Sequence, residues 1–351
     1  MNKTATKSNK NIFDLVKFIM ALCVVAIHTH PLENVQIPIV QSIFDTVFSL
    51  AVPFFFLCSG YLLAGKMQGD YNSEENISLV KKMLFRILKM YIIWMAVYFP
   101  LAVYGYIISG SSLIKSVVFY LRGLFLVGEH YHSYPLWYLL STVFACLFIL
   151  ILYKLKCSHR AVVGIGFTVI MIAFATAFLI NYNGELPKIP DLYCGVIRNT
   201  IVNPRILFGM FYFPFGMSLA RKDISSPIAI IMFASGFIGR CIFIDNIFIS
   251  YVFLLICAVG FFAVILRINL KDAKIYYPLR KSSTVIYLIH MYVWSAVCLL
   301  IYHSNEKFGF VPFILTSFIS IIISFIYIGI KNKKTAVSQR IATDCADGNE
   351  V

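Results

Sequence analysis

Apolar stretches of about membrane-spanning length recur along this 351-residue chain. A helix needs about 20 apolar residues to cross the hydrocarbon layer of a bilayer. Ten stretches approach that length, the sixth and seventh being the shortest: 12–30, 40–64, 84–108, 136–153, 161–180, 205–220, 226–243, 247–266, 283–302 and 309–330. Because 60% of the residues are hydrophobic and only 13% are charged, we predict an all-α polytopic membrane protein with one integral membrane domain.

The 30 Lys and Arg residues are divided unevenly between the predicted loops. If the N-terminus is cytoplasmic, 23 of these 30 residues lie on the cytoplasmic side. Such a bias is typical of cytoplasmic loops, so residues 1–11 are predicted as a cytoplasmic segment and residues 331–351 as a cytoplasmic tail or linker. The basic residues separate apolar segments, so the net charge of +14 indicates contact with a lipid bilayer and not with nucleic acid.

Nine Cys residues are scattered along the chain, several within apolar stretches. None belongs to a C-x-x-C pair, so neither a metal site nor a disulfide framework is predicted. The local cluster at residues 156–159 contains Cys157 and His159 and is interpreted as a solvated loop, with metal binding as the alternative.

The predicted external loop 109–135 is long for a compact membrane protein, and long loops are usually functional or disordered. It is interpreted as a substrate lid, although solvent exposure alone would explain the polarity of Glu129, His130 and His132. Within this loop, residues 113–127 are apolar but interrupted by Lys and Arg, and they are interpreted as an interfacial or re-entrant helix.

The first predicted span carries three ionisable residues, Asp14, Lys17 and His28. Lys17 and His28 are eleven positions apart, so they share a helix face and lie about 16 Å apart along the axis. An ionisable residue inside a span is costly and is therefore a functional hypothesis. The alternative is a local Asp14–Lys17 pair at the cytoplasmic interface, with His28 as a hydrogen-bonded packing residue.

Basic residues also enter the start of the third predicted span. Arg86 and Lys89 lie on one face, with Lys82 a turn earlier. Their long side chains are interpreted as snorkelling anchors, or as a site for phosphate groups that enter from the cytoplasm.

Two further stretches have a structural interpretation. Pro53 and the Ser59-Gly60 step predict a kink or a close helix contact in the second span. Trp137 follows a proline at the start of the fourth span, which is typical of an aromatic belt at the membrane interface.

The ninth predicted span begins with a polar face. Ser283, Tyr287 and His290 are spaced by four and three residues, so their side chains share one side of a helix. His290 is a second histidine within a predicted span.

Five motifs occur together in a fixed order: Lys17-x10-His28, Val-Pro-Phe-Phe-Phe-x-x-Ser-Gly ending at Gly60, Arg86-x-x-Lys89, Pro135-Leu-Trp-Tyr-Leu and Ser283-x3-Tyr287-x2-His290. In this order the chain resembles the acyltransferase 3 family of ten-span membrane proteins, over residues 11–330. The first-helix motif of that family is Arg or Lys, ten residues, then His, which matches Lys17 and His28.

The resemblance implies transfer of an acyl group, usually acetyl from cytoplasmic acetyl-CoA, to a hydroxyl of an exported or cell-envelope acceptor. Acyl-CoA would be a co-substrate, and no cofactor would be bound permanently. His28 would be the general base or a transient acyl carrier. The matching positions give a catalytic set of His28, Lys17, His290 and Tyr287, a phosphate-binding set of Arg86, Lys89 and Lys17, and a substrate set of Asp14, Ser283, Trp137 and Asp45.

The stretches around His28 and Pro53 are also similar to the membrane domains of VanT-type serine racemases from vancomycin-resistant Gram-positive bacteria. That similarity implies a multi-pass protein of the bacterial cytoplasmic membrane that supplies L-serine, with a racemase domain joined after Val351. The chain contains no racemase lysine motif, so it is not itself the racemase.

In the transport alternative, Asp14 or Asp45 would bind the ammonium group of an amino acid, and Lys17 or Arg86 its carboxylate. The chain lacks an internal repeat, which argues mildly against a carrier. A sensor or scaffold built on an inactive acyltransferase fold is a third interpretation.

Overall fold

The computed structural model describes residues 5–347, with side chains for residues 11–333. Within this range all regular structure is helical, as the sequence predicts. The chain divides into two compact units, one formed by residues 1–34 and 269–351 and the other by residues 35–268.

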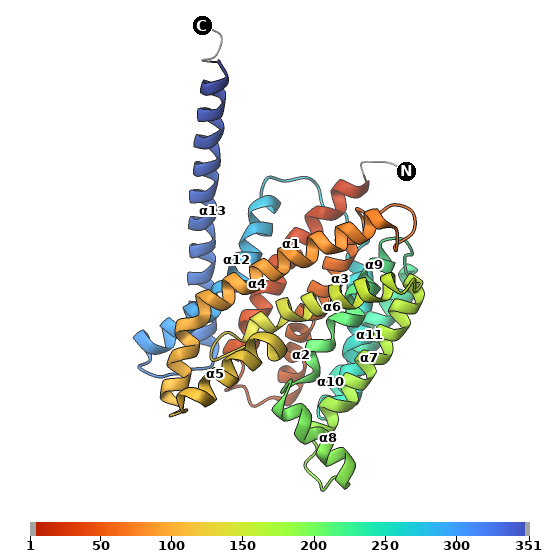
Figure 1. The fold of residues 1–351 in the computed structure, drawn as a ribbon, viewed down its shortest axis with the longest axis vertical. Helices are drawn as coiled ribbons and strands as arrows, with labels where there is room; N and C mark the ends of the chain where they lie inside the picture. Colours follow the sequence, from red (N-terminus) through yellow and green to blue (C-terminus); the bar gives the residue numbers. More distant parts are fainter. Residues whose placement is uncertain (1–4, 348–351) are drawn as a thin grey trace. The chain divides into compact units, whose positions relative to one another are not determined.

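The first unit joins the two ends of the chain. Its helices are α1 (Ala5–Thr29), α12 (Tyr276–Ile301) and α13 (Phe310–Asp347). Asp14 lies by Arg280, and His28 lies by His290, so α1 and α12 run parallel (Figure 1). Residues that are far apart in the sequence therefore form one continuous face.

The C-terminal helix α13 packs antiparallel to α12. The hydroxyls of Ser282 and Ser324 hydrogen-bond, and Lys281 donates to Asn332. The helix extends to Asp347, so much of the predicted tail is helical. Residues 1–4 and 348–351 of the predicted terminal segments lie outside the described residues.

The end of α1 is fixed by its sequence. His30 adopts a left-handed backbone conformation, with φ of 44°, and its amide donates to the carbonyl oxygen of Ala26 at 3.0 Å. Pro31 follows and cannot continue the helix. The amide of Gly309 donates to the carbonyl oxygen of Thr29 at 2.8 Å, which ties this end to the start of α13.

The second unit contains the remaining helices: α2 (Pro38–Ser49), α3 (Ala51–Ala64), α4 (Glu74–Ile108), α5 (Leu113–Arg122), η1 (Gly123–Val127), η2 (Tyr134–Leu136), α6 (Trp137–Lys154), α7 (His159–Ile180), α8 (Lys188–Asn199), η3 (Pro204–Leu207), α9 (Gly209–Leu219), α10 (Ser226–Ile242) and α11 (Ile247–Ile265).

Eight helical segments among the described residues are long and apolar enough to cross a membrane. They correspond to eight of the ten predicted spans, with α2 and α3 together forming one segment. The sixth and seventh predicted spans correspond to η3 with α9 and to α10, which are shorter helices.

The predicted kink in the second span occurs between α2 and α3. The helix breaks at Leu50, three residues before Pro53. Proline has no amide hydrogen, so Pro53 cannot donate to the carbonyl of Ser49, where α2 ends. The kink therefore lies one turn N-terminal to the proline that causes it.

Glycines allow the central helices of the second unit to pack backbone to backbone. A Cβ added to Gly60 would lie 2.0 Å from the carbonyl oxygen of Phe213, and one added to Gly216 would lie 2.2 Å from that of Leu57. The predicted close helix contact at Ser59-Gly60 is therefore the packing of α3 against α9.

The apolar segment 113–127 is not among the helical segments long and apolar enough to cross a membrane. It forms the ten-residue helix α5 and the π-helical turn η1. Ten helical residues rise only about 15 Å, half of the hydrocarbon thickness.

Two glycines of α7 provide a matched test of close packing. A Cβ on Gly166 would lie 2.3 Å from the carbonyl oxygen of Met210 in α9, whereas a Cβ on Gly164 would meet no atom within 4 Å. We expect Gly166→Ala to destabilise the fold by about 1–3 kcal/mol through overpacking. Gly164→Ala should be neutral or slightly stabilising. Unfolding midpoints in detergent measure both effects, and equal midpoints for the two variants would contradict the packing.

Candidate functional site

Two histidines lie side by side in the first unit. The ring centroids of His28 in α1 and His290 in α12 are 5.5 Å apart, with 31° between the ring planes. His290 is fully buried, and its Nδ1 lies 3.1 Å from the carbonyl oxygen of Ile286. A carbonyl only accepts, so we assign the proton to Nδ1 and leave Nε2 as a basic nitrogen. Within the described residues, this Nε2 has no hydrogen-bond partner.

The polar face predicted for the ninth span is buried. Tyr287 lies one turn before His290, with ring centroids 6.3 Å apart. Ser283 lies a further turn back, where its hydroxyl donates to the carbonyl oxygen of Arg280 at 2.8 Å. The face therefore runs from an arginine near the start of α12 to the histidine pair.

An ion pair stabilises the start of the same face. Asp14 is buried, and its Oδ2 lies 4.0 Å from Nε of Arg280. Lys17 follows one turn later on α1 and is half-buried. Arg280 is a residue that the sequence placed only among the cytoplasmic loop charges. Its proximity to Asp14 depends on the pairing of α1 with α12, which no local pattern indicates.

Two of the three predicted phosphate-binding residues, Arg86 and Lys89, belong to the second unit, whereas Lys17 belongs to the first. Lys82, Arg86 and Lys89 follow one another along an exposed stripe of α4. None of the three forms a hydrogen bond or ion pair with another described residue. The stripe is accessible to an anion, and it is equally suited to snorkelling.

Asp45 lies on an exposed part of α2 and interacts electrostatically with Arg240 of α10. A substrate ammonium group would therefore share this carboxylate with an arginine.

Trp137, at the start of α6, is covered by the guanidinium of Arg205. No local pattern in the sequence indicates this contact. The Arg205 guanidinium lies 4.8 Å from the Trp137 ring centroid and forms an ion pair with Glu129. Burial raises the pKa of the Glu129 carboxyl, and the positive charge of Arg205 partly opposes that rise. An interfacial tryptophan is thus part of a cation–aromatic–carboxylate stack.

The interpretation of loop polarity as solvent exposure is wrong for two histidines. His130 is 8% exposed and His132 is 2% exposed. Tyr120 stacks on His130 at 4.5 Å, the Tyr106 hydroxyl lies 3.1 Å from Nδ1 of His130, and Tyr131 stacks on His132 at 3.8 Å. The density of aromatic residues in and beside this loop is the sequence signal for such stacking. Burial lowers the pKa of each imidazole to about 4.

The interpretation of residues 156–159 as a solvated loop is also wrong for His159. It begins α7, with Nδ1 2.7 Å from the Tyr153 hydroxyl and Nε2 3.0 Å from the Ser218 hydroxyl. Tyr71 stacks on its ring at 3.9 Å. Both ring nitrogens are thus hydrogen-bonded. Within residues 11–333 no group of three His, Cys, Asp or Glu side chains is arranged to hold a metal ion.

The buried loop histidines predict an acid-sensitive fold. In the unfolded chain these imidazoles are protonated below about pH 6.5, whereas in the folded loop they stay neutral down to about pH 4. The free energy of unfolding is therefore highest above pH 6.5 and decreases as the pH falls from 6.5 to 4. Each imidazole contributes up to about 1.4 kcal/mol per pH unit. We expect the double variant His130→Gln, His132→Gln to show a weaker dependence of the unfolding midpoint on pH between 7 and 4.5. A dependence as steep as that of the wild type would contradict neutral burial.

Comparisons with known proteins agree with this architecture. The acyltransferase domain family matches residues 10–329. An amino-acid racemase from Enterococcus faecalis is 25% identical over 95% of this chain and 48% of its own length. A serine/alanine racemase from Enterococcus gallinarum is 29% identical over 56% of this chain and 25% of its own length. No solved structure matches the chain.

The chain spans at most about half the length of these curated relatives, so their names describe longer proteins. The family match, in contrast, covers nearly all of this chain, from residue 10 to residue 329. The chain therefore belongs to the acyltransferase 3 family of membrane proteins.

Proposed function

We propose that this protein is an O-acyltransferase that moves an acyl group, most simply acetyl, from cytoplasmic acyl-CoA to a hydroxyl of an exported or cell-envelope acceptor. Family membership supports membrane acyl transfer in general. The observation that carries the proposal furthest is the His28–His290 pair, because it puts a basic nitrogen and a second imidazole together inside the helices of one unit.

His28 is the proposed general base. It removes the proton from the acceptor hydroxyl as that oxygen attacks the thioester carbonyl, and the tetrahedral intermediate then expels the CoA thiolate, which takes up the proton from His28. One C–O bond forms and one C–S bond breaks, so no oxidant or reductant is needed. A neutral imidazole is suited to this exchange near pH 7.

His290 is the proposed positioning residue for His28. Its Nδ1 is held by its own helix backbone, which fixes the orientation of the ring beside His28. The neighbouring Tyr287 supplies a hydroxyl that could polarise the thioester carbonyl. Asp14 and Ser283, nearer the start of this face, are proposed to orient the substrate.

The cations are proposed to hold the donor. Arg86 and Lys89 lie exposed on α4, and Lys17 lies half-buried on α1. Guanidinium and ammonium groups pair well with the phosphate oxygens of CoA. Trp137 and Asp45 belong to the second unit, and their contact with an acceptor stays a prediction from the sequence.

Removal of His28 tests the proposal. We expect His28→Ala to reduce acetyl-CoA-dependent transfer by at least about 100-fold, the scale of a lost general base. The measurement is release of free CoA thiol by purified protein in vesicles, together with incorporation of radiolabelled acetyl into acceptor. His30→Asn is the matched control, because it changes a nearby exposed histidine and asparagine tolerates the left-handed backbone. Retained transfer in folded His28→Ala protein would contradict the role of His28.

Transport of a small amino acid, such as L-serine, is the second candidate. The similarity to an amino-acid racemase and a serine/alanine racemase favours it, because such proteins act on small amino acids. In this proposal Asp14 or Asp45 binds the ammonium group, and Lys17 or Arg86 binds the carboxylate. A vancomycin-resistance role would follow only if a racemase domain were joined after Val351.

The two candidates are separated by one assay on the same vesicles. Exchange of radiolabelled serine without acetyl-CoA would support transport, whereas acetyl-CoA consumption without serine exchange would support acyl transfer. In the first case, either Asp14→Asn or Asp45→Asn should abolish serine exchange. Serine exchange that is unaffected by Asp14→Asn and Asp45→Asn would exclude the proposed ammonium site.

A further inference from the structure

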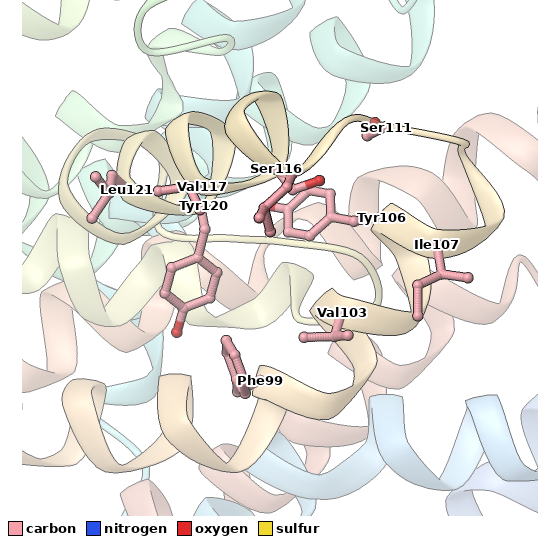
Figure 2. Close-up of a pocket in the computed structure, with 10 residues that line it drawn as sticks. Phe99, Val103, Tyr106, Ile107, Ser111, Ser116, Val117, Tyr120 and Leu121 are labelled. Atoms are coloured by element: carbon pink, nitrogen blue, oxygen red, sulfur yellow. The ribbon is translucent and has the colours of Figure 1, made fainter.

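A cavity of about 390 Å³ lies between the end of α4 and the short helix α5. Figure 2 shows side chains of the two helices converging on it. Apolar residues form most of its wall, with Phe99, Val103 and Ile107 from α4 and Leu113, Val117 and Leu121 from α5. Its volume is within the range of sites that bind small molecules, about 300–1,000 Å³.

His130, one of the two buried loop histidines, contacts two residues of the cavity wall. Tyr106 and Tyr120 line the cavity, and both contact His130, one by a hydrogen bond and the other by ring stacking. His130 is in turn fixed by Ser133, whose hydroxyl accepts from the His130 amide at 2.6 Å. The cavity is therefore a formed site with a fixed side, and its two tyrosines give one part of the wall a polar character.

Two further features bound the cavity: a contact between aromatic rings and the turn that joins α4 to α5. Phe99 meets Tyr120 edge to face at 5.3 Å. Ser111, in the turn that joins α4 to α5, lines the cavity as well. The lining residues Ser116, Val117 and Tyr120 recur at helical spacing, so one face of α5 covers the space.

The cavity is continuous with a surface that the membrane covers. α4 is one of the helices long and apolar enough to cross the bilayer, and the lining residues Phe99 and Ile107 are exposed on it. Leu113 and Ile114 of α5 are each 80% exposed, which in water would be costly and in lipid is not. The exposed residues around the cavity are thus suited to contact with hydrocarbon.

The cations of α5 lie away from the cavity. Lys115 and Arg122 are seven residues apart on α5 and both lie over the ring of Phe119. At helical spacing these three residues occupy the face of α5 opposite the lining residues Val117 and Tyr120. The helix therefore offers an apolar face to the cavity and carries its positive charge on the other side.

We propose that the cavity between α4 and α5 binds one hydrocarbon chain of a membrane phospholipid. The bound chain fills space that water would occupy unfavourably between apolar walls. The site does not depend on which reaction the histidine pair of the first unit carries out.

Photo-crosslinking tests the site. The full-length protein is placed in vesicles of phosphatidylcholine that contain phosphatidylglycerol with a diazirine in one acyl chain, and crosslinked peptides are mapped by mass spectrometry. We expect crosslinks to concentrate in residues 99–107 and 113–121. The reference is α10, whose Ile230 and Ile231 are similarly exposed but line no part of this cavity. Crosslinks spread over both regions in proportion to exposed area would overturn the proposal.

Two neighbouring valines provide matched variants. Val117 lines the cavity and is 50% exposed, whereas Val118 is 56% exposed and does not line it. Val117→Trp should fill the cavity and lose the concentrated crosslinks, while Val118→Trp should keep them. Equal labelling of the two variants would count against a bound chain. If Val117→Trp fails to fold, the wild-type crosslink map alone decides between the outcomes.

Discussion

A bilayer offers no hydrogen bonds to polar side chains, so an ionisable group inside a span needs a partner from a neighbouring helix. The parallel packing of α1 against α12 supplies those partners in the first unit. It brings Arg280 to Asp14 at one level and His290 to His28 at another. Acyl transfer as proposed here depends on that pairing, because neither helix alone carries two imidazoles at one level.

The second unit meets the same constraint by close packing and by folding its long loop. Glycines let α3 and α7 approach the backbone of α9, so these helices bury main chain against main chain. The loop after α4 folds its polar groups inward, where Tyr106 and Tyr120 satisfy or cover His130. The cavity beside α5 is a consequence of this folded loop, since α5 is too short to span and leaves space against α4.

Local patterns in the sequence predicted most of the helices and part of the candidate site. Apolar length identified the spans, and helical spacing put Ser283, Tyr287 and His290 on one buried face. The break at Leu50 was predicted as a kink because proline lacks an amide, but its position one turn earlier follows from the hydrogen bond that is lost.

Contacts between distant segments could not be predicted in this way. The ion pair of Asp14 with Arg280 joins positions far apart in the chain, and no periodicity relates them. For the loop histidines, the sequence leaves solvent exposure open as an explanation beside a substrate lid. His130 is instead buried by stacking on Tyr120 of α5 and by a hydrogen bond with Tyr106 of α4. These contacts can be known only from the folded loop.

The central claim is that His28 and His290 act as one unit in acyl transfer. A double-mutant cycle tests it most directly, with acetyl-CoA-dependent transfer measured for His28→Ala, His290→Ala and the double variant in vesicles. If His290 acts through His28, the double variant should lose no more activity than His28→Ala alone. The account would be contradicted if the fold-losses in activity of the two single variants multiplied in the double variant. It would also be contradicted if the double variant retained the wild-type rate.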